Sequence, residues 1–265
     1  MRKWFALPVA VILIGIVFLF TMANKNAANT EIHYQDKAIV LMYHHVDTVF
    51  EEGKSNSGTM MADQFHAHMQ ALKDHHYEVI TMQQFLDFKL HNKSIPDNAV
   101  VLTFDDGYES FYTHVFPIMK EFGMTATNFI IGYTSDLYNP DAYPHLNWEQ
   151  MTELKQHGMG IFSHTYNLHV FAPIAADGKE GPSLSNPIYL KSRERMETNE
   201  EFRKRIGSDL AFMNKRIEDE LGAQPKLLAF PFGAFNEEVI SVGQELGIDL
   251  FFKIEEGINT RDSHE

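Results

Sequence analysis

The sequence predicts an α/β protein folded as a closed or nearly closed (β/α) barrel of seven or eight units. About 230 residues follow residue 37, enough for one such domain. Residues 98–106, NAVVLTFDD, form a mainly apolar run that includes the β-branched Val100, Val101 and Thr103 and ends in two aspartates, as is typical of a parallel strand covered on both faces. Segments of strand length alternate with helical ones, which indicates a parallel sheet; the strands are expected at 38–46, 78–81, 98–106, 126–132, 160–164, 226–232 and 250–254.

The intervening segments carry helix signals. Residues 62–75 space their apolar side chains as one face of a helix does. Further helices are expected from Tyr112 to Phe122, closed by Gly123, and after Asn236. The polar residues 170–197 are expected to form an inserted surface loop. Three helix starts have the residue pairs of a capping box, Thr81 with Gln84, Asn147 with Gln150, and Thr198 with Glu201.

The N-terminal part, residues 1–23, is expected to be a signal anchor or a signal peptide. Arg2 and Lys3 precede 20 uncharged residues, Trp4 to Ala23, which is long enough to span a bilayer. An uncleaved anchor is favoured over cleavage near Ala23 because the apolar run is long. Residues 24–37 would be a linker and residues 38–265 the folded domain. Either reading places that domain outside the cytoplasm, membrane-anchored or secreted to the cell surface, with the membrane as a partner.

Composition excludes several classes of function. The net charge of −14 argues against nucleic acid as a partner. The chain has no cysteine, which excludes disulfides, thiolate metal sites and a cysteine nucleophile. The hydrophobic fraction of 44% is ordinary for a globular protein with a full core.

Polar clusters follow four of the predicted strands. They read YHH, TFDDGY, SHTYNLH and FPFGAFN, and each lies at the C-terminal end of its strand. In a (β/α) barrel these ends meet on one rim, where active sites are assembled from loops. The four clusters are therefore expected to form one site.

The histidines and aspartates of these clusters suit a metal site. His164 and His169 are five residues apart and can converge only if the chain turns after its strand. With Asp106 they would give two imidazoles and one carboxylate, the ligand set of a catalytic zinc with an open position; iron or cobalt could also use it. Asp105 points away from its neighbour and could serve as a general base. The alternative is a surface loop with ordinary histidines beside an Asp-Asp-Gly turn.

Three of these segments resemble the motifs of a known family. Thr103–Tyr108, His164–His169 and Phe230–Gly233 are similar to the first three motifs of the polysaccharide deacetylases, carbohydrate esterase family 4, whose fold is a distorted (β/α)7–8 barrel of the NodB-homology type. The spacing of the two histidines, the early Tyr43-His44 and the long segment after His169 resemble the poly-β-1,6-N-acetyl-D-glucosamine deacetylases of biofilm-forming bacteria.

The resemblance implies a metal-dependent hydrolase that removes N-acetyl groups from an extracellular polysaccharide and releases acetate. Asp105 would activate water, and Asp106, His164 and His169 would bind zinc, or alternatively cobalt, nickel or iron. Beyond the polysaccharide substrate, a synthase or export machinery is a further expected partner. Contacts to substrate or oxyanion are expected from Phe232, where the family commonly has tyrosine, and from Tyr108 and Asn167.

His44 is the expected general acid. Much of the family carries a late Leu-x-His motif for this role, and the residues after Gly233 contain none. His44 matches the histidine thought to protonate the leaving amine in the biofilm branch, and an ordinary imidazole pKa near about 6.5 suits that task. His45 is expected to point elsewhere and to be structural.

Within the same chemistry, peptidoglycan or chitin oligomers could replace the biofilm polymer as substrate. Two other classes of function also remain open. A non-catalytic glycan-binding domain could retain the barrel, and a metal-dependent amidase acting on another amide could share the site.

Overall fold

The structure, a computed structural model, describes residues 31–49 and 58–262. The expected membrane segment and the first half of the expected linker, residues 24–30, lie outside these residues. Within the described ranges, no helix is long and apolar enough to cross a membrane. From Tyr34 onward the chain forms one compact unit.

A curled, mostly parallel sheet organises this unit. All seven predicted strands are present, and β14 adds an eighth. Only β14 runs antiparallel, along the start of β1, and β4 pairs with β5 outside the main path. The path, in spatial order, is β13 (Leu250–Phe252), β12 (Leu227–Ala229), β7 (Gly160–Ser163), β6 (Thr127–Ile130), β5 (Ala99–Phe104), β1 (Lys37–Tyr43) and β14 (Asn259–Thr260), with β4 at Glu78–Val79.

The sheet curls as a barrel does but does not close, so the expected α/β barrel is confirmed only in part. Within the described residues, no pairing joins β13 to β14 or to β1. The chain crosses the gap as an irregular segment, residues 253–258, and β14 pairs only with Lys37 and Ala38 at the start of β1. A cavity of about 400 Å³ lies in the gap, lined by β1, β13 and this segment. The result is a half-barrel that stays open beside the C-terminal end of β1.

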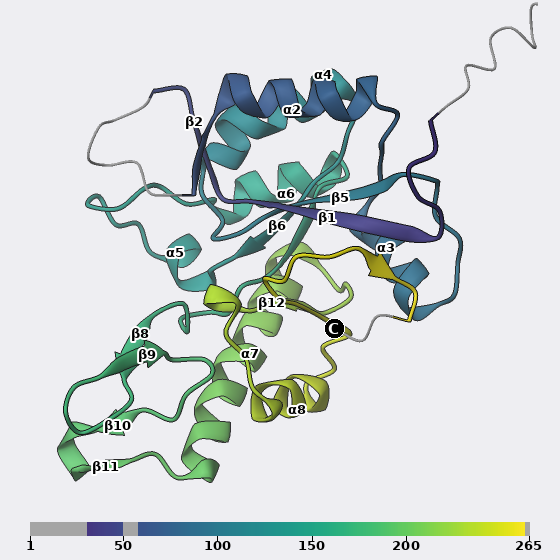
Figure 1. The fold of residues 1–265 in the computed structure, drawn as a ribbon. Coiled ribbons are helices and arrows are strands. Elements are labelled where there is room, and N and C mark those ends of the chain that lie inside the picture. Colours follow the sequence, from purple (N-terminus) through teal and green to yellow (C-terminus); the bar gives the residue numbers. More distant parts are fainter. Residues whose placement is uncertain (1–30, 50–57, 263–265) are drawn as a thin grey trace, which may run out of the picture. The chain divides into compact units, whose positions relative to one another are not determined.

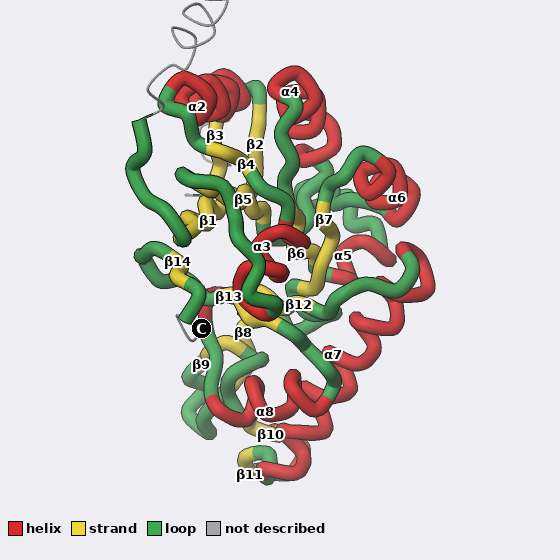
Figure 2. The backbone as a smooth tube through the Cα atoms, turned by 90° about the vertical axis from the view of Figure 1, so that its right-hand side faces the viewer, coloured by secondary structure: helices red, strands yellow, loops and turns green. Residues whose placement is uncertain are grey.

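Helices pack on both faces of the sheet: most lie on its outer face, as Figures 1 and 2 show, whereas the helix from Met82 to Leu90 packs through Phe85 and Phe88 on the face that carries Val101. The three expected capping boxes are confirmed, at Thr81, Asn147 and Thr198. Gly123 ends its helix with φ 64°, as expected, although that helix begins with a π-helical turn at Phe111–Val115. The helices are α2 (Ala62–Asp74), α3 (Met82–Leu90), α4 (Phe116–Phe122), α5 (Gly132–Asp136), α6 (Trp148–Gln156), α7 (Asn199–Leu221) and α8 (Glu237–Glu245).

Strand β5 is the centre of the core. Every one of its residues is buried, which explains its continuous apolar sequence. Leu102 and Phe104 point into the cluster beneath α2, α4 and α6, whereas Val101 joins the cluster on the other face. Burying each of these side chains contributes about 1.5–3 kcal/mol. The strand therefore ends at a fixed position, directly before Asp105.

The segment 170–197 is more ordered than the expected surface loop. It contains two hairpin-like pairs, β8 (Phe171–Pro173) with β9 (Glu180–Pro182) and β10 (Tyr189–Leu190) with β11 (Arg195–Met196). Arg205 of α7 binds this segment by donating to the carbonyl of Ser183 at 2.8 Å, the carbonyl of Asn186 at 2.9 Å and the carboxylate of Glu197 at 2.8 Å. A further short pair, β2 (His45–Asp47) with β3 (Thr59–Met61), follows β1.

Candidate functional site

Asp106, His164 and His169 lie together beyond the ends of β5 and β7. One oxygen of Asp106, Oδ1, is 3.6 Å from Nε2 of His164 and 3.3 Å from Nε2 of His169. One ligand atom from each residue lies within 4.8 Å of the others. The three residues that the sequence singled out as metal ligands are therefore brought together as expected.

The loop after β7 makes this convergence possible. Thr165 adopts φ 72°, which reverses the chain as soon as the strand has ended. Its hydroxyl then accepts a hydrogen bond from the backbone N–H of Leu168 at 3.1 Å. The carboxylate of Asp209, on α7, accepts the backbone N–H groups of Tyr166 at 2.9 Å and Asn167 at 2.8 Å. These bonds fix the turn that places His169 opposite His164.

The three candidate ligand residues present unprotonated nitrogen and oxygen atoms to a cation. Nδ1 of His164 lies 2.9 Å from the carbonyl of Ala229, so it is assigned the proton and Nε2 keeps its lone pair towards the site. Burial lowers the pKa of His164 to about 4 and also lowers the pKa of His169, so both rings are neutral near pH 7. Oδ1 of Asp106 is buried and has no hydrogen-bond partner in the described part of the chain. Two neutral imidazoles and an unsatisfied carboxylate oxygen fit a divalent metal ion.

Asp105 occupies a different environment from its neighbour. Its backbone N–H donates to the carbonyl of Tyr43 at 2.9 Å, and Asp106 turns away from it with φ 74°. Burial, and secondarily the charge of Asp106, raises the pKa of Asp105 to about 8. A cation bound by the neighbouring ligands would favour the carboxylate form of Asp105, because an opposite charge nearby stabilises the ionised state.

A cavity of about 600 Å³ opens over these residues. His44 lies in the short break between β1 and β2 and lines this cavity. The next residue, His45, is buried and packs instead on the rings of Tyr108 and Tyr143, at centroid distances of 5.1 Å and 4.5 Å. The adjacent histidines therefore separate as expected, with only the first in the site cavity. The residues that line it are Met42, Tyr43, His44, Gly58, Thr59, Met60, Asp105, Asp106, His164, His169, Phe230, Phe232 and Ile254.

The three expected substrate contacts differ in position. Phe232 lines the cavity and has φ 59°, and its ring contacts that of His169 in a tilted arrangement with the centroids 4.3 Å apart. Tyr108 does not line it; its ring lies between those of His45 and His145. Asn167 is exposed on the turn after His164 and is also absent from the cavity wall. The geometry thus brings only Phe232 to the metal ligands.

Two residues near the site had not been identified from the sequence. Asp209 fixes the turn between His164 and His169 through its hydrogen bonds. It lies on α7, more than 40 residues further along the chain, and no local sequence pattern predicts that contact. His145 stacks on Tyr108 at 5.0 Å, and the charge of Asp106 acts on its pKa, which burial nevertheless lowers. Its position follows from the bridge between residues 108 and 145, which is a long-range pairing.

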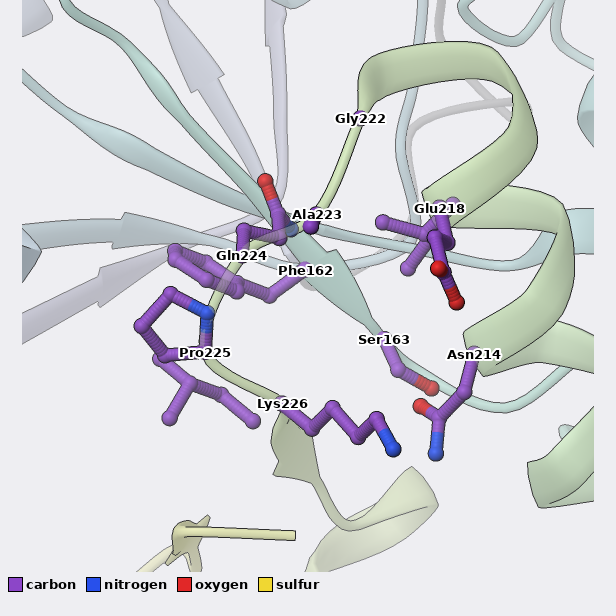
Figure 3. A pocket seen from close by; sticks show the side chains of 11 residues that line it. Phe162, Ser163, Asn214, Glu218, Gly222, Ala223, Gln224, Pro225 and Lys226 are labelled. Carbon is purple, nitrogen blue, oxygen red and sulfur yellow. The ribbon is translucent and has the colours of Figure 1, made fainter. Parts of the chain in front are cut away.

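A second cavity, of about 240 Å³, lies between β7, the end of α7 and the turn before β12. Figure 3 shows the side chains of Ser163, Asn214 and Lys226 converging on it. Nζ of Lys226 already donates to the carbonyl of Leu246 at 3.0 Å, and the cavity contains none of the expected metal ligands. It is therefore separate from the candidate site.

Comparison with known proteins identifies relatives of the chain. A model of the polysaccharide deacetylase family matches residues 92–251. The poly-β-1,6-N-acetyl-D-glucosamine N-deacetylase of Escherichia coli K12 is 30% identical over 200 residues, which cover 71% of this chain. The chain spans only 30% of the length of that relative.

Two further comparisons cover more of the chain. The poly-β-1,6-N-acetyl-D-glucosamine N-deacetylase of Staphylococcus aureus MSSA476 is 25% identical over 285 aligned positions, covering 100% of this chain and 90% of the relative. The solved structure of a de-N-acetylase from Aggregatibacter actinomycetemcomitans has a TM-score of 0.79 at 28% identity, covering 86% of this chain and 92% of that one. The half-barrel is therefore a fold shared with solved deacetylases.

Proposed function

The chain belongs to the polysaccharide deacetylase family of hydrolases, which act on carbon–nitrogen bonds other than peptide bonds, and from this premise we propose that it removes N-acetyl groups from poly-β-1,6-N-acetyl-D-glucosamine. The observation that carries the proposal is the buried set of Asp106, His164 and His169 beside Asp105 in one open cavity. The choice of polymer is supported by the relatives in Escherichia coli and Staphylococcus aureus, because the names of both proteins state that substrate.

Asp106, His164 and His169 would hold a divalent ion, with zinc as the proposed metal. When bound, the ion supplies Lewis acidity at the acetyl carbonyl. Asp105 takes the proton of the attacking water, since it lines the cavity but is not among the three ligands. The Phe232 backbone N–H, at the turn with φ 59°, is proposed to donate to the developing oxyanion. That role needs no side-chain hydroxyl, so the phenylalanine is compatible with it.

His44 is the proposed general acid for the departing amine. It lines the cavity together with Asp105, and its charge acts on both His164 and His169, so it lies near the reacting centre. Protonating the nitrogen turns a strongly basic amide anion into a neutral amine that can leave. His45 has no place in this step, because its ring is buried against tyrosines.

We also propose that the domain acts outside the cytoplasm, held by the N-terminal apolar segment. The support is the uncharged run from Trp4 to Ala23 behind Arg2 and Lys3. Fractionation of cells that express the full chain would test this: the protein should remain with membranes after a high-salt wash and should be cleaved by protease added to intact protoplasts. A polysaccharide synthase or exporter remains a proposed partner.

The deciding experiment uses the full chain, stripped of metal and assayed for amine release from β-1,6-linked N-acetylglucosamine oligomers with and without added zinc, cobalt, nickel or iron. Asp105→Asn should abolish release and His44→Ala should reduce it about 100-fold or more, as expected for a lost acid or base. Asp219→Asn, at an exposed position of α7, and His75→Ala, at the exposed C-cap of α2, are the matched controls. Full activity in Asp105→Asn would contradict the assigned base.

The same assay separates the alternative substrates and classes. Faster release from chitin or peptidoglycan oligomers than from the β-1,6 series would move the substrate within the family. A folded chain that binds the oligomers but releases no amine with any metal would be a glycan-binding module. Release from small non-carbohydrate amides alone would favour a general amidase.

A further inference from the structure

An exposed pair of aromatic rings extends the site beyond the metal ligands. The ring centroid of Phe232 lies 4.3 Å from that of His169 and 4.7 Å from that of Phe171. Phe171 is 53% exposed and Phe232 is 41% exposed. The two side chains, here called the aromatic shelf, therefore continue the cavity from a metal ligand onto the β8–β9 hairpin.

Packing in the core does not account for the shelf. Phe171 sits opposite Pro182 in the hairpin, and more than half of its surface remains in contact with solvent. Phe232 adopts a left-handed backbone conformation, with φ 59° and ψ 14°, which costs a side chain of this size about 1 kcal/mol or more. That conformation turns the ring onto His169 instead of burying it. Exposed apolar surface that adjoins a polar site commonly marks a ligand contact.

The chemistry of the shelf suits a sugar. An aromatic face carries negative partial charge, and a pyranose ring presents a face of C–H groups with positive partial charge. Resting on the proposed function, we propose that Phe171 and Phe232 form a subsite for the sugar next to the one that is deacetylated, in the same polymer chain. The shelf borders the cavity through Phe232, so a glycan that enters the site passes onto it. The hairpin thereby gives the enzyme a preference for longer chains.

Two readouts on the full chain test the subsite. The first is the ratio of kcat/KM for a β-1,6-linked N-acetylglucosamine pentamer to that for the dimer. The second is calorimetric binding of the pentamer to metal-free protein. In Phe171→Ala and Phe171→Leu the length preference and the affinity should each fall about 5-fold, the size expected of one lost aromatic contact. Phe171→Trp should retain both, because it keeps a ring face.

The variants separate stacking from packing and from loss of fold. Phe171→Leu keeps an apolar side chain in the hairpin but has no ring, and Leu90→Ala, 44% exposed at the end of α3, is the control. Unchanged pentamer binding in both Phe171→Ala and Phe171→Leu would overturn the subsite. Self-association that Phe171→Ala abolishes, with glycan binding intact, would assign the shelf to a second copy of the chain. If no oligomer is hydrolysed but Phe171→Leu still weakens pentamer binding, the proposed function fails and the subsite stands.

Discussion

Replacing Asp209 by asparagine should weaken metal binding although this residue is not a ligand. Each of its two carboxylate oxygens accepts one backbone N–H from the turn between His164 and His169, at 2.9 Å from Tyr166 and 2.8 Å from Asn167. In Asp209→Asn one oxygen becomes an NH2 group, which cannot accept. The turn would lose one of its two anchors, and His169 would no longer be held opposite His164.

The magnitude follows from these two hydrogen bonds. A hydrogen bond to a charged group contributes about 1.5–3 kcal/mol, and the substitution removes one of the pair together with the charge. Burial raises the pKa of Asp209, which means that the carboxylate pays a desolvation penalty that the neutral amide avoids. The expected net loss in the free energy of unfolding is about 1–2 kcal/mol. Residues that orient metal ligands typically affect metal affinity by about 10–100-fold, and we expect the lower end here because one anchor remains.

The assay is zinc titration of the metal-free chain by calorimetry, with urea unfolding of the same samples. Asp219→Asn lies on the same helix, where its carboxylate pairs with the exposed Lys215, and serves as the control. A Kd for zinc in Asp209→Asn within about 2-fold of that of the unmodified chain would refute the role of Asp209, even if stability fell as expected.

Three other outcomes are expected. Gly107→Ala should lower the free energy of unfolding by about 2 kcal/mol in urea. The backbone φ of Gly107 is 77°, and an added Cβ would lie 3.0 Å from Cγ2 of Ile130 and 3.3 Å from its Cα. A smaller loss of stability than in the exposed control Gly178→Ala would count against this prediction. For metal-free protein, the free energy of unfolding should fall by up to about 3 kcal/mol as the pH is lowered from 6.5 to 4. In this range His164 is protonated in the unfolded state but stays neutral in the folded state, where burial lowers its pKa to about 4. An equally steep fall in His164→Asn would contradict this prediction. Arg205→Ala should speed proteolysis within residues 183–197, where it donates to two carbonyls and a carboxylate, and an unchanged cleavage rate would show that other contacts hold this segment.

Local features were determined by the sequence alone. The capping boxes at Thr81, Asn147 and Thr198 form as expected because the partners of such a cap are three residues apart. The seven predicted strands are present, and β5 forms as expected because its sequence is a nearly continuous apolar run that is buried at every position. The turn after His164 was expected for a similarly local reason, since two ligands five residues apart cannot converge on a continuing strand.

Tertiary structure decided what depends on distant partners. Whether the sheet closes depends on how β14 and the segment before it meet β1, and the two-residue antiparallel contact leaves the barrel open. Asp209 and His145 reach the site through contacts across more than 35 residues, and no periodicity in the chain encodes such contacts. The sequence could thus name Asp106, His164 and His169 as a possible ligand set, because residue type and strand ends are local properties. Only the folded chain shows which other side chains share their cavity, since that depends on how helices and loops pack around the sheet.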